Sequence, residues 1–160
     1  MIKGREYTMA KKMGKKIVAM NKQARRLYDI ITTYEAGIVL LGPEVKSIRN
    51  GKVNFVDSYV DVVDEAYIVG LHIASYEQSG YALCEPTRKR KLLLHAKEIH
   101  VLAKQVAIKG MTIVPLSLYF NNGKIKIEIA VGKGRKLYDH RHVLKERAEK
   151  REVMREMKYR

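Results

Sequence analysis

A hairpin signal in the last third of the chain commits much of it to antiparallel β-structure. Two stretches, 111–120 and 124–131, are rich in β-branched and aromatic residues, and Asn121-Asn122-Gly123 stands between them. Asn-Gly favours a tight hairpin turn, because both residue types tolerate the positive φ that such turns require. In the second stretch charged residues alternate with isoleucines, which predicts a strand with one buried face and one charged face.

Shorter β-branched and aromatic segments predict further strands on the N-terminal side of this hairpin. Each is bounded by residues that favour turns, such as Gly, Asp or Asn. The expected strands are 29–34, then 38–41 after a turn or bulge at Glu35-Ala36-Gly37, two strands between Phe55 and Ile73 that meet at Asp64-Glu65, and a short strand near Tyr81–Leu83.

Three helices are expected beside these strands. Asn21 is a good N-cap for a short helix over 22–28. Pro43 at a first helical position and Gly51 just beyond the end mark a two-turn helix. Apolar residues recur at helical spacing over 92–108, which predicts the third helix.

Six or seven strands with about three short helices predict a mainly β fold, specifically a small antiparallel OB-like β-barrel. A two-layer α+β sandwich is the alternative. The 160 residues suffice for one domain. The expected organisation is a flexible basic arm at 1–16, the barrel at 17–131 and a basic tail at 132–160.

Positive charge is concentrated at the two ends of the chain. Residues 1–27 hold nine Lys or Arg against one Glu, and residues 132–160 hold eleven against five acidic residues. The stretch between them has twelve basic and eleven acidic residues, so the net charge of +15 lies almost entirely in the ends. A balanced body with two basic arms is typical of a protein that binds a polyanion. Solvated tails without a partner are the alternative.

The end of the tail, 145–160, is rich in good helix formers and has a Glu146–Lys150 pair at helical spacing. Its apolar face is narrow, and a helix of this length with a weak face is marginal in water. We therefore expect the tail to be disordered when free and helical on its partner.

Other features exclude whole classes of protein. No window approaches about 18 consecutive apolar residues, so no membrane span is expected. The apolar run after the basic N-terminus, 17–20, is too short for a signal peptide. The single Cys84 cannot form an internal disulfide, which predicts a reducing, cytoplasmic location.

The residues offer no convincing catalytic set. His140 and His142 stand two apart without a third ligand nearby, so they are expected to be solvated or to face RNA. The enzyme alternative is a metal-dependent nuclease that gathers Glu35, Glu44 and Asp57 around Mg²⁺. No carboxylate motif supports it, so we expect no enzyme activity, no cofactor and no metal.

Several long segments match a known family in the order that the family has them: Tyr34–Asn54 with Asp57-Ser58-Tyr59, Pro86–His95, Gly110–Phe120 and Gly132–Arg141. In these segments the chain resembles the small protein B family, the bacterial partners of transfer-messenger RNA. The resemblance extends over about residues 17–158. One departure is Asp139-His140-Arg141 where the family usually has Asp-Lys-Arg, and another is Gly132-Lys133-Gly134 for Gly-Lys-Lys.

The resemblance implies an OB-type barrel that binds the transfer-RNA-like domain of transfer-messenger RNA. The complex enters stalled ribosomes, where the protein mimics an anticodon stem and codon in the A site and the nascent peptide receives a degradation tag. Peptidyl transfer belongs to the ribosome, so the protein itself is not expected to be an enzyme. Its implied partners are this RNA, the decoding centre and the messenger channel, and it is expected to be a monomer when free.

The resemblance also assigns roles to residues by position. Glu35 would accept from base amino groups or 2′-hydroxyls, Arg88, Arg90 and Lys91 would clamp phosphates, and Tyr138 would stack on a base at the decoding centre. The full set of predicted RNA contacts is Asn21, Lys22, Arg25, Glu35, Lys46, Arg49, Asn54, Arg88, Arg90, Lys91, Lys124 and Lys126. The predicted ribosome contacts are Gly132, Lys133, Arg135, Lys136, Tyr138, Asp139 and Arg141. A ribosomal protein or an initiation-factor-like OB protein is the competing binding module.

Overall fold

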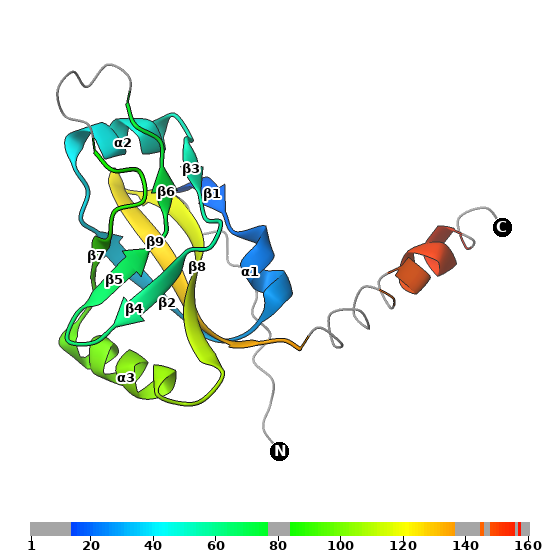
Figure 1. Ribbon diagram of the computed structural model, residues 1–160. Coiled ribbons are helices and arrows are strands. Elements are labelled where there is room, and N and C mark those ends of the chain that lie inside the picture. The colour runs from blue at the N-terminus through cyan, green and yellow to red at the C-terminus, as the bar shows by residue number, and fades with distance from the viewer. Residues whose placement is uncertain (1–13, 77–83, 137–144, 146–147, 156, 158–160) are drawn as a thin grey trace.

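The predicted hairpin forms the longest pair of strands in the computed structural model, which describes residues 14–76, 84–136, 145, 148–155 and 157 (Figure 1). Strands β8 (Met111–Asn121) and β9 (Lys124–Gly134) pair in antiparallel register around Asn122 and Gly123. Both turn residues have positive φ, 49° and 75°, as the Asn-Gly turn requires. The hairpin prediction is confirmed.

Within these described ranges the hairpin is joined by seven other strands, by three labelled helices and by a helical stretch near the C-terminus. The strands are β1 (Lys15–Met20), β2 (Tyr28–Ile38), β3 (Val53–Asn54), β4 (Tyr59–Val62), β5 (Ala66–Val69), β6 (His72–Ile73) and β7 (Arg90–Leu93). The helices are α1 (Lys22–Leu27), α2 (Gly42–Arg49) and α3 (Ala96–Val106), and residues 148–155 are also helical. The mainly β class and the helices expected near 22–28 and 43–50 are confirmed. No helix in the described ranges is long and apolar enough to cross a membrane.

The strand pairings form a circuit. Hydrogen-bonded neighbours follow the order β1-β8-β4-β5-β7-β2-β9, and β9 pairs with β8 as well. The pairings therefore run from β8 through β4, β5, β7, β2 and β9 and return to β8, with β1 attached outside on β8. The short strands β3 and β6 pair separately.

The main apolar core lies inside this circuit, and a second, smaller cluster packs Ala24 of α1 against Val114, Leu116 and Ala130. Helices α2 and α3 lie at opposite ends of the circuit, and α1 lies beside β8 (Figure 1). Each helix buries one apolar residue: Ala24 from α1, Ile48 from α2 and Leu102 from α3. The strands contribute the rest of the core, chiefly Val60, Ile68, Leu92, Ile113, Leu118, Ile127, Ile129 and Val131.

The turn predicted at Glu35-Ala36-Gly37 and the separate strand at 38–41 are wrong. Strand β2 runs unbroken from Tyr28 to Ile38, because its last residues exchange one partner for another. Gly37 lies opposite Lys126 of β9 on one side and Leu93 of β7 on the other. A Cβ at Gly37 would lie 3.2 Å from the Leu93 Cβ, so glycine here permits close strand contact instead of a turn.

The helix predicted over 92–108 begins too early. Leu92 and Leu93 belong to β7, where Leu92 pairs with Ala66 of β5 and with Ile38 of β2. Helix α3 starts at Ala96, and the Glu98 carboxylate accepts a hydrogen bond from the His95 N–H (2.9 Å). Burial between two strands outweighs the good helix propensity of leucine.

The sheet also extends beyond both predicted barrel boundaries. Strand β1 was not predicted, and it starts at Lys15, inside the segment assigned to the flexible arm. Strand β9 continues to Gly134, so Gly132 and Lys133 lie in the sheet and not in the tail. The strand expected near Tyr81–Leu83 lies outside the described residues, as do residues 1–13.

Candidate nucleic-acid interface

Glu35 lies on the outer face of the sheet within a network of charged side chains. Its Oε2 accepts hydrogen bonds from the Lys15 ammonium (2.8 Å) and from the Tyr119 hydroxyl. The Lys15 ammonium also donates to the Tyr119 oxygen (3.0 Å) and lies 4.1 Å from the centre of the tyrosine ring. The Glu35 side chain remains 40% exposed, so a ligand can reach it.

The network changes the protonation chemistry of its three members. The hydrogen bond from Lys15, followed by that from Tyr119, lowers the pKa of Glu35 below its ordinary value. Burial, together with the hydrogen bond to Glu35, raises the pKa of Tyr119 to about 12. Burial opposes the charge on Lys15, but hydrogen bonds to Glu35 and Tyr119 outweigh it and raise the pKa of Lys15. At neutral pH the site therefore holds a carboxylate, an ammonium and a neutral phenol.

Three other residues predicted to contact RNA, Asn21, Lys22 and Asn54, border a cleft of about 210 Å³ between the start of α1 and β3. Asn21 uses its side chain for the fold, since Oδ1 caps α1 at 3.1 Å and Nδ2 donates to the Pro115 carbonyl (2.9 Å). Asn54 accepts the Val56 N–H through Oδ1 (3.0 Å). Lys22 is exposed at the rim. The cleft thus presents a cation beside amide groups.

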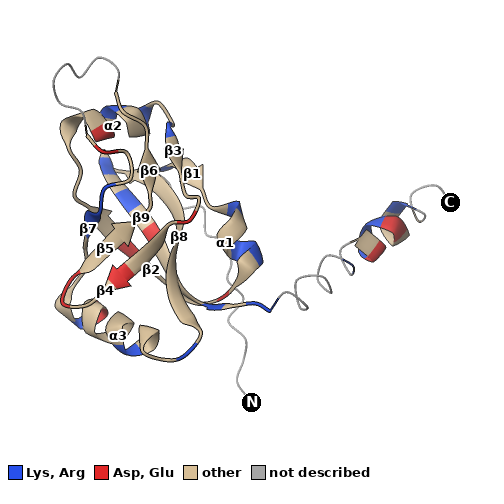
Figure 2. Ribbon diagram, viewed as in Figure 1, with Lys and Arg blue, Asp and Glu red and all other residues tan. Residues whose placement is uncertain are grey.

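Exposed cations also extend over the helices. Arg25 lies on α1, and Lys46 and Arg49 lie on α2, all with exposed side chains. Lys46 places its ammonium 5.2 Å from the centre of the Tyr76 ring. Figure 2 shows Lys and Arg on both helices and along β9. These positions suit contacts to a phosphate backbone, which carry affinity without sequence selectivity.

Lys124 and Lys126 of β9 border a hollow of about 340 Å³ that has an apolar lining. Leu93 and Val45 line it from β7 and α2. Leu93 is 55% exposed and so offers an apolar contact beside the two cations. A ligand with a charged backbone and flat apolar groups, as in a nucleic acid, would match this pairing.

Arg90 is not the phosphate contact that the sequence predicted. Its side chain is 0% exposed, and its N–H groups donate to Glu44 Oε1 (2.8 Å) and to the carbonyls of Leu71 (2.7 Å), Arg88 (3.1 Å) and Pro86 (2.9 Å). We therefore assign Arg90 a structural role. A run of basic residues on a strand alternates in direction, so one of its cations points inward.

Arg88 is also tied to this carboxylate. Its Nε and one terminal nitrogen donate to the two oxygens of Glu44 at 2.9 and 2.6 Å. Glu44 itself is 3% exposed, and it further accepts from the Leu41 N–H (2.8 Å). Arg88 keeps 27% of its side chain exposed, so its predicted RNA contact would have to involve the outer edge of the guanidinium.

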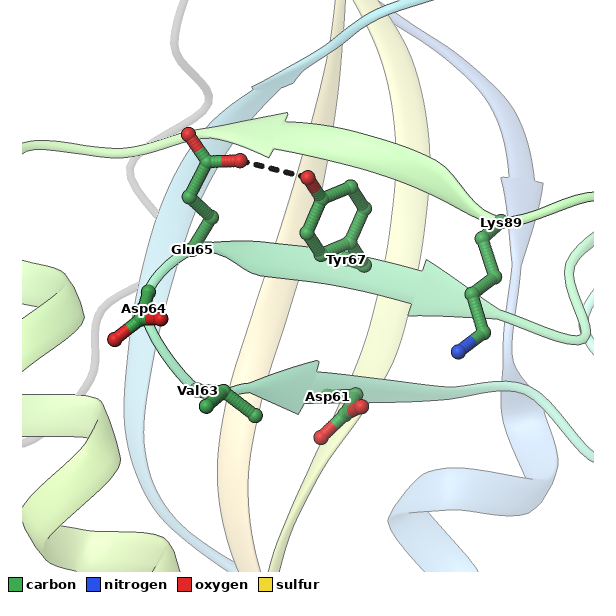
Figure 3. A pocket seen from close by; sticks show the side chains of 6 residues that line it. All are labelled: Asp61, Val63, Asp64, Glu65, Tyr67 and Lys89. Atoms are coloured by element: carbon green, nitrogen blue, oxygen red, sulfur yellow. Dashed lines mark hydrogen bonds between the residues drawn. The ribbon is translucent and has the colours of Figure 1, made fainter.

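Lys91 lies at the edge of an acidic region, where its ammonium forms an ion pair with Glu65. A hollow of about 520 Å³ nearby is lined mostly by acidic or uncharged groups of β4, β5 and the turn between them (Figure 3). Phosphate would be repelled there, so an RNA backbone is expected on other surfaces. The lining residues are Asp61, Val63, Asp64, Glu65, Tyr67 and Lys89.

The end of β9 carries the first predicted ribosome contacts. Gly132 is buried, and a Cβ there would lie 3.0 Å from the Tyr28 Cβ, so a larger residue would require Tyr28 of β2 to shift. Arg135, which directly follows β9, donates through Nε to Asp29 (2.6 Å). This ion pair holds the end of β9 against β2. Lys133 and Lys136 are exposed. The predicted contacts Tyr138, Asp139 and Arg141 lie outside the described residues.

Two residues of the Glu35 network were missed by sequence reasoning. The sequence places Lys15 in the flexible arm and identifies Tyr119 only as part of a strand. The alternation along β8 could have indicated that a tyrosine shares a face with the charged side of β9. No pattern in the sequence indicated β1. Among the described residues, no group of three or more His, Cys, Asp or Glu side chains is arranged to hold a metal ion.

The protein is a small, basic β-sheet protein with exposed cations around the sheet and the Glu35 carboxylate held among them. This surface chemistry is that of the class of nucleic-acid-binding proteins. The chain belongs to the SmpB protein family, which matches residues 18–159. The family predicted from the sequence segments is thereby confirmed.

Two curated relatives are similar over almost their whole length. The sequence is 56% identical over 150 residues to the SsrA-binding protein of Lawsonia intracellularis (strain PHE/MN1-00), covering 93% of this chain and 97% of the relative. It is also 56% identical over 151 residues to the SsrA-binding protein of Nitratidesulfovibrio vulgaris (strain DP4), covering 93% and 98%. A solved structure described as "tmRNA-SmpB: a journey to the center of the bacterial ribosome" is 47% identical, with a TM-score of 0.64 over 74% of this chain and 85% of that one.

Proposed function

We propose that the protein is an SsrA-binding protein that binds the transfer-RNA-like domain of transfer-messenger RNA and accompanies it into stalled ribosomes. The observation that carries this proposal is the fixed carboxylate of Glu35 among exposed cations. Cations alone would suit any RNA, because phosphates are the same in every sequence. A carboxylate that accepts from a base amino group or a 2′-hydroxyl adds selectivity for particular nucleotides. The relatives named SsrA-binding protein support the choice of RNA.

The circuit of strand pairings has a role in this proposal. We infer that it is an OB-like barrel, a fold that commonly presents one face to nucleic acid. The outer face of β8, β9 and β2 would then form part of the RNA surface. Helices α1 and α2 would extend that surface with Lys22, Arg25, Lys46 and Arg49.

The ribosomal part of the proposal concerns the end of β9 and the tail. Lys133, Arg135 and Lys136 would begin the contact with the decoding centre, and the basic tail would enter the messenger channel as a helix. The protein would act by binding and by mimicry of a codon and anticodon stem, while the ribosome catalyses peptide transfer. Its place of work would be the cytoplasm. A structure described as tmRNA-SmpB in the bacterial ribosome supports these partners.

A salt series tests the proposal directly. Binding of transfer-messenger RNA and of an ordinary transfer RNA is measured at increasing salt. With about four to six phosphates neutralised, the slope of log affinity against log salt is expected near about −3 to −5 for both RNAs. The preference for transfer-messenger RNA is expected to persist at high salt, because hydrogen bonds to bases and 2′-hydroxyls release no counterions.

Two variants that each change one charge make the salt series interpretable. Lys22→Ala is expected to weaken the binding of both RNAs by the same factor. It should also make the slope of log affinity against log salt less negative by about one. Asp61→Ala, in the acidic hollow of β4, changes one charge away from the proposed surface and is the control. If the wild-type protein binds both RNAs equally at every salt concentration, it is a general basic RNA binder, as a ribosomal protein would be.

A further inference from the structure

We infer that Lys15 and Tyr119 are positioning residues that hold the Glu35 carboxylate by one oxygen and present the other to a hydrogen-bond donor of the RNA. This rests on the proposed function and deepens it. The donor would be the amino group of an exposed base or a 2′-hydroxyl, since both can donate to a carboxylate. The inference makes β1, which precedes α1, part of the recognition site.

The geometry separates the two carboxylate oxygens. Both donors, the Lys15 ammonium and the Tyr119 hydroxyl, bind Oε2. Within the described part of the chain, Oε1 receives no hydrogen bond. One oxygen is therefore fixed by the protein, and the other is open to an incoming ligand.

The supports come from separate strands, which makes the position of the carboxylate well determined. Lys15 extends from β1, Tyr119 from β8 and Glu35 from β2, while β9 lies between β8 and β2. Tyr119 is 3% exposed, so packing holds its ring and directs its hydroxyl. The Lys15 ammonium is in turn held against that ring at 4.1 Å. A side chain fixed before binding loses less rotational freedom when the ligand arrives.

The charges around Glu35 keep it an acceptor. The facing groups are Lys15 of β1, Tyr119 of β8, and Lys126 and Glu128 of β9. Lys15 lowers the pKa of Glu35 most, and Lys126 adds to the effect. Glu128 lies opposite Glu35, but the Ser117 hydroxyl donates to it (3.1 Å). An ionised Glu35 accepts hydrogen bonds and repels phosphate, which excludes an RNA backbone from this point and selects a donor.

A double-mutant cycle tests the inference in the full-length protein. The preference for transfer-messenger RNA over an ordinary transfer RNA is measured at high salt for K15M, Y119F, E35Q and the doubles K15M/E35Q and Y119F/E35Q. E35Q is expected to lower the preference by about tenfold, the usual effect of losing one hydrogen bond to a charged group. K15M and Y119F are each expected to lower it by a smaller factor. In the E35Q background both changes should have no further effect on the preference.

Matched variants distinguish a residue that positions the Glu35 carboxylate from a cation that only attracts phosphate. Lys16→Met removes an exposed cation from the neighbouring position of β1. It should weaken the binding of both RNAs by the same factor and leave the preference for transfer-messenger RNA unchanged. Lys15→Arg keeps a donor for Oε2 and should recover most of the preference. Urea unfolding of each variant reports whether the fold is retained, and Y119F keeps the buried ring in place.

A second readout needs no RNA. In the free protein, the titration of Glu35 followed by carboxyl NMR should move to higher pH in K15M and Y119F, because each loses a donor that favours the ionised form. Specific binding that needs ionised Glu35 is present above its pKa and is lost as pH falls through that pKa. The loss should therefore begin at higher pH in K15M than in the wild type.

The outcomes distinguish the inference from the proposed function. If the wild type prefers transfer-messenger RNA but K15M and K16M behave alike, Lys15 is an ordinary phosphate contact and the inference is overturned. Equal effects of K15M in the wild-type and E35Q backgrounds, or an unchanged Glu35 titration, would also overturn it. A wild type without any preference would overturn the proposed function, and the role assigned to Lys15 and Tyr119 would fall with it.

Discussion

Glu44→Ala is expected to lower the free energy of unfolding by about 3–5 kcal/mol, the cost of leaving a buried charge without its partner. The Arg90 guanidinium that would lose its carboxylate is 0% exposed. Four N–H donors reach Glu44, two from Arg88, one from Arg90 and one from the Leu41 backbone. Such a loss is a large part of the about 5–15 kcal/mol that stabilises a typical domain.

Glu65→Ala is the matched control. Glu65 also pairs with a cation of β7, Lys91, but the two side chains are 44% and 41% exposed. Water screens an exposed pair of this kind, so it contributes little to stability and this variant should be close to wild type. Urea unfolding with an unchanged m-value gives both free energies. If the two variants differ by less than about 1 kcal/mol, the Glu44 network does not hold α2 to β7 as the structure indicates.

The same network predicts a pH dependence of stability. Burial opposes the charge of Glu44, but hydrogen bonds from Arg88, the Leu41 N–H and Arg90 outweigh it and lower its pKa below the ordinary 4.5. The unfolded chain therefore binds this proton more readily than the folded one, and Glu44 contributes stability above pH 4.5 that is lost as pH falls through its folded pKa. Glu44→Ala should remove this contribution, so its unfolding free energy should fall less steeply below that pH than that of the wild type.

The ion pairs of Glu44 with Arg88 and Arg90 could not be predicted from the sequence. The run from Arg88 to Lys91 is basic at every position, and nothing local distinguishes the one cation that points inward. Arg90 becomes buried because β7 pairs with β5, and because α2 brings Glu44 over it. Both are contacts between segments far apart in the chain. The hairpin around Asn122 and the helix after Pro43 could be predicted, since local turn and capping chemistry determines them.

The Glu35 site was predicted only in part for a related reason. The segment containing Glu35 could be recognised, but its supports come from β1 and β8. Residues 15–20 lack a clear alternation, so β1 acquires strand structure from pairing with β8 and not from its own pattern. Tyr119 lies two strands away from Glu35 in the sheet. A site assembled across several strands is visible only once their order and register are known.

Truncation after Lys136 is expected to abolish ribosome rescue while transfer-messenger RNA binding stays within about threefold of the wild type, since most proposed phosphate contacts remain. The cut lies beyond β9, which ends at Gly134, and beyond Arg135, whose N–H donates to the Leu27 carbonyl (2.9 Å). The removed segment holds eight Lys or Arg against five acidic residues, a net charge of +3. Rescue is measured as tagging of a nascent peptide on ribosomes that stall at the end of a message without a stop codon.

A full-length variant separates the apolar face of the tail from its charge. Val153, Met154 and Met157 are 50%, 74% and 75% exposed, and 153 and 154 lie in the helical stretch 148–155. Changing all three to Ser leaves every charge in place but removes the apolar face, so rescue should fall sharply while RNA binding is unchanged. If truncation weakens RNA binding as strongly as rescue, the RNA surface extends past Lys136 and the assignment to β9 and the helices is wrong. If rescue survives truncation, the proposed role of the tail in the messenger channel is wrong, because the truncated chain lacks the side chains that would bind there.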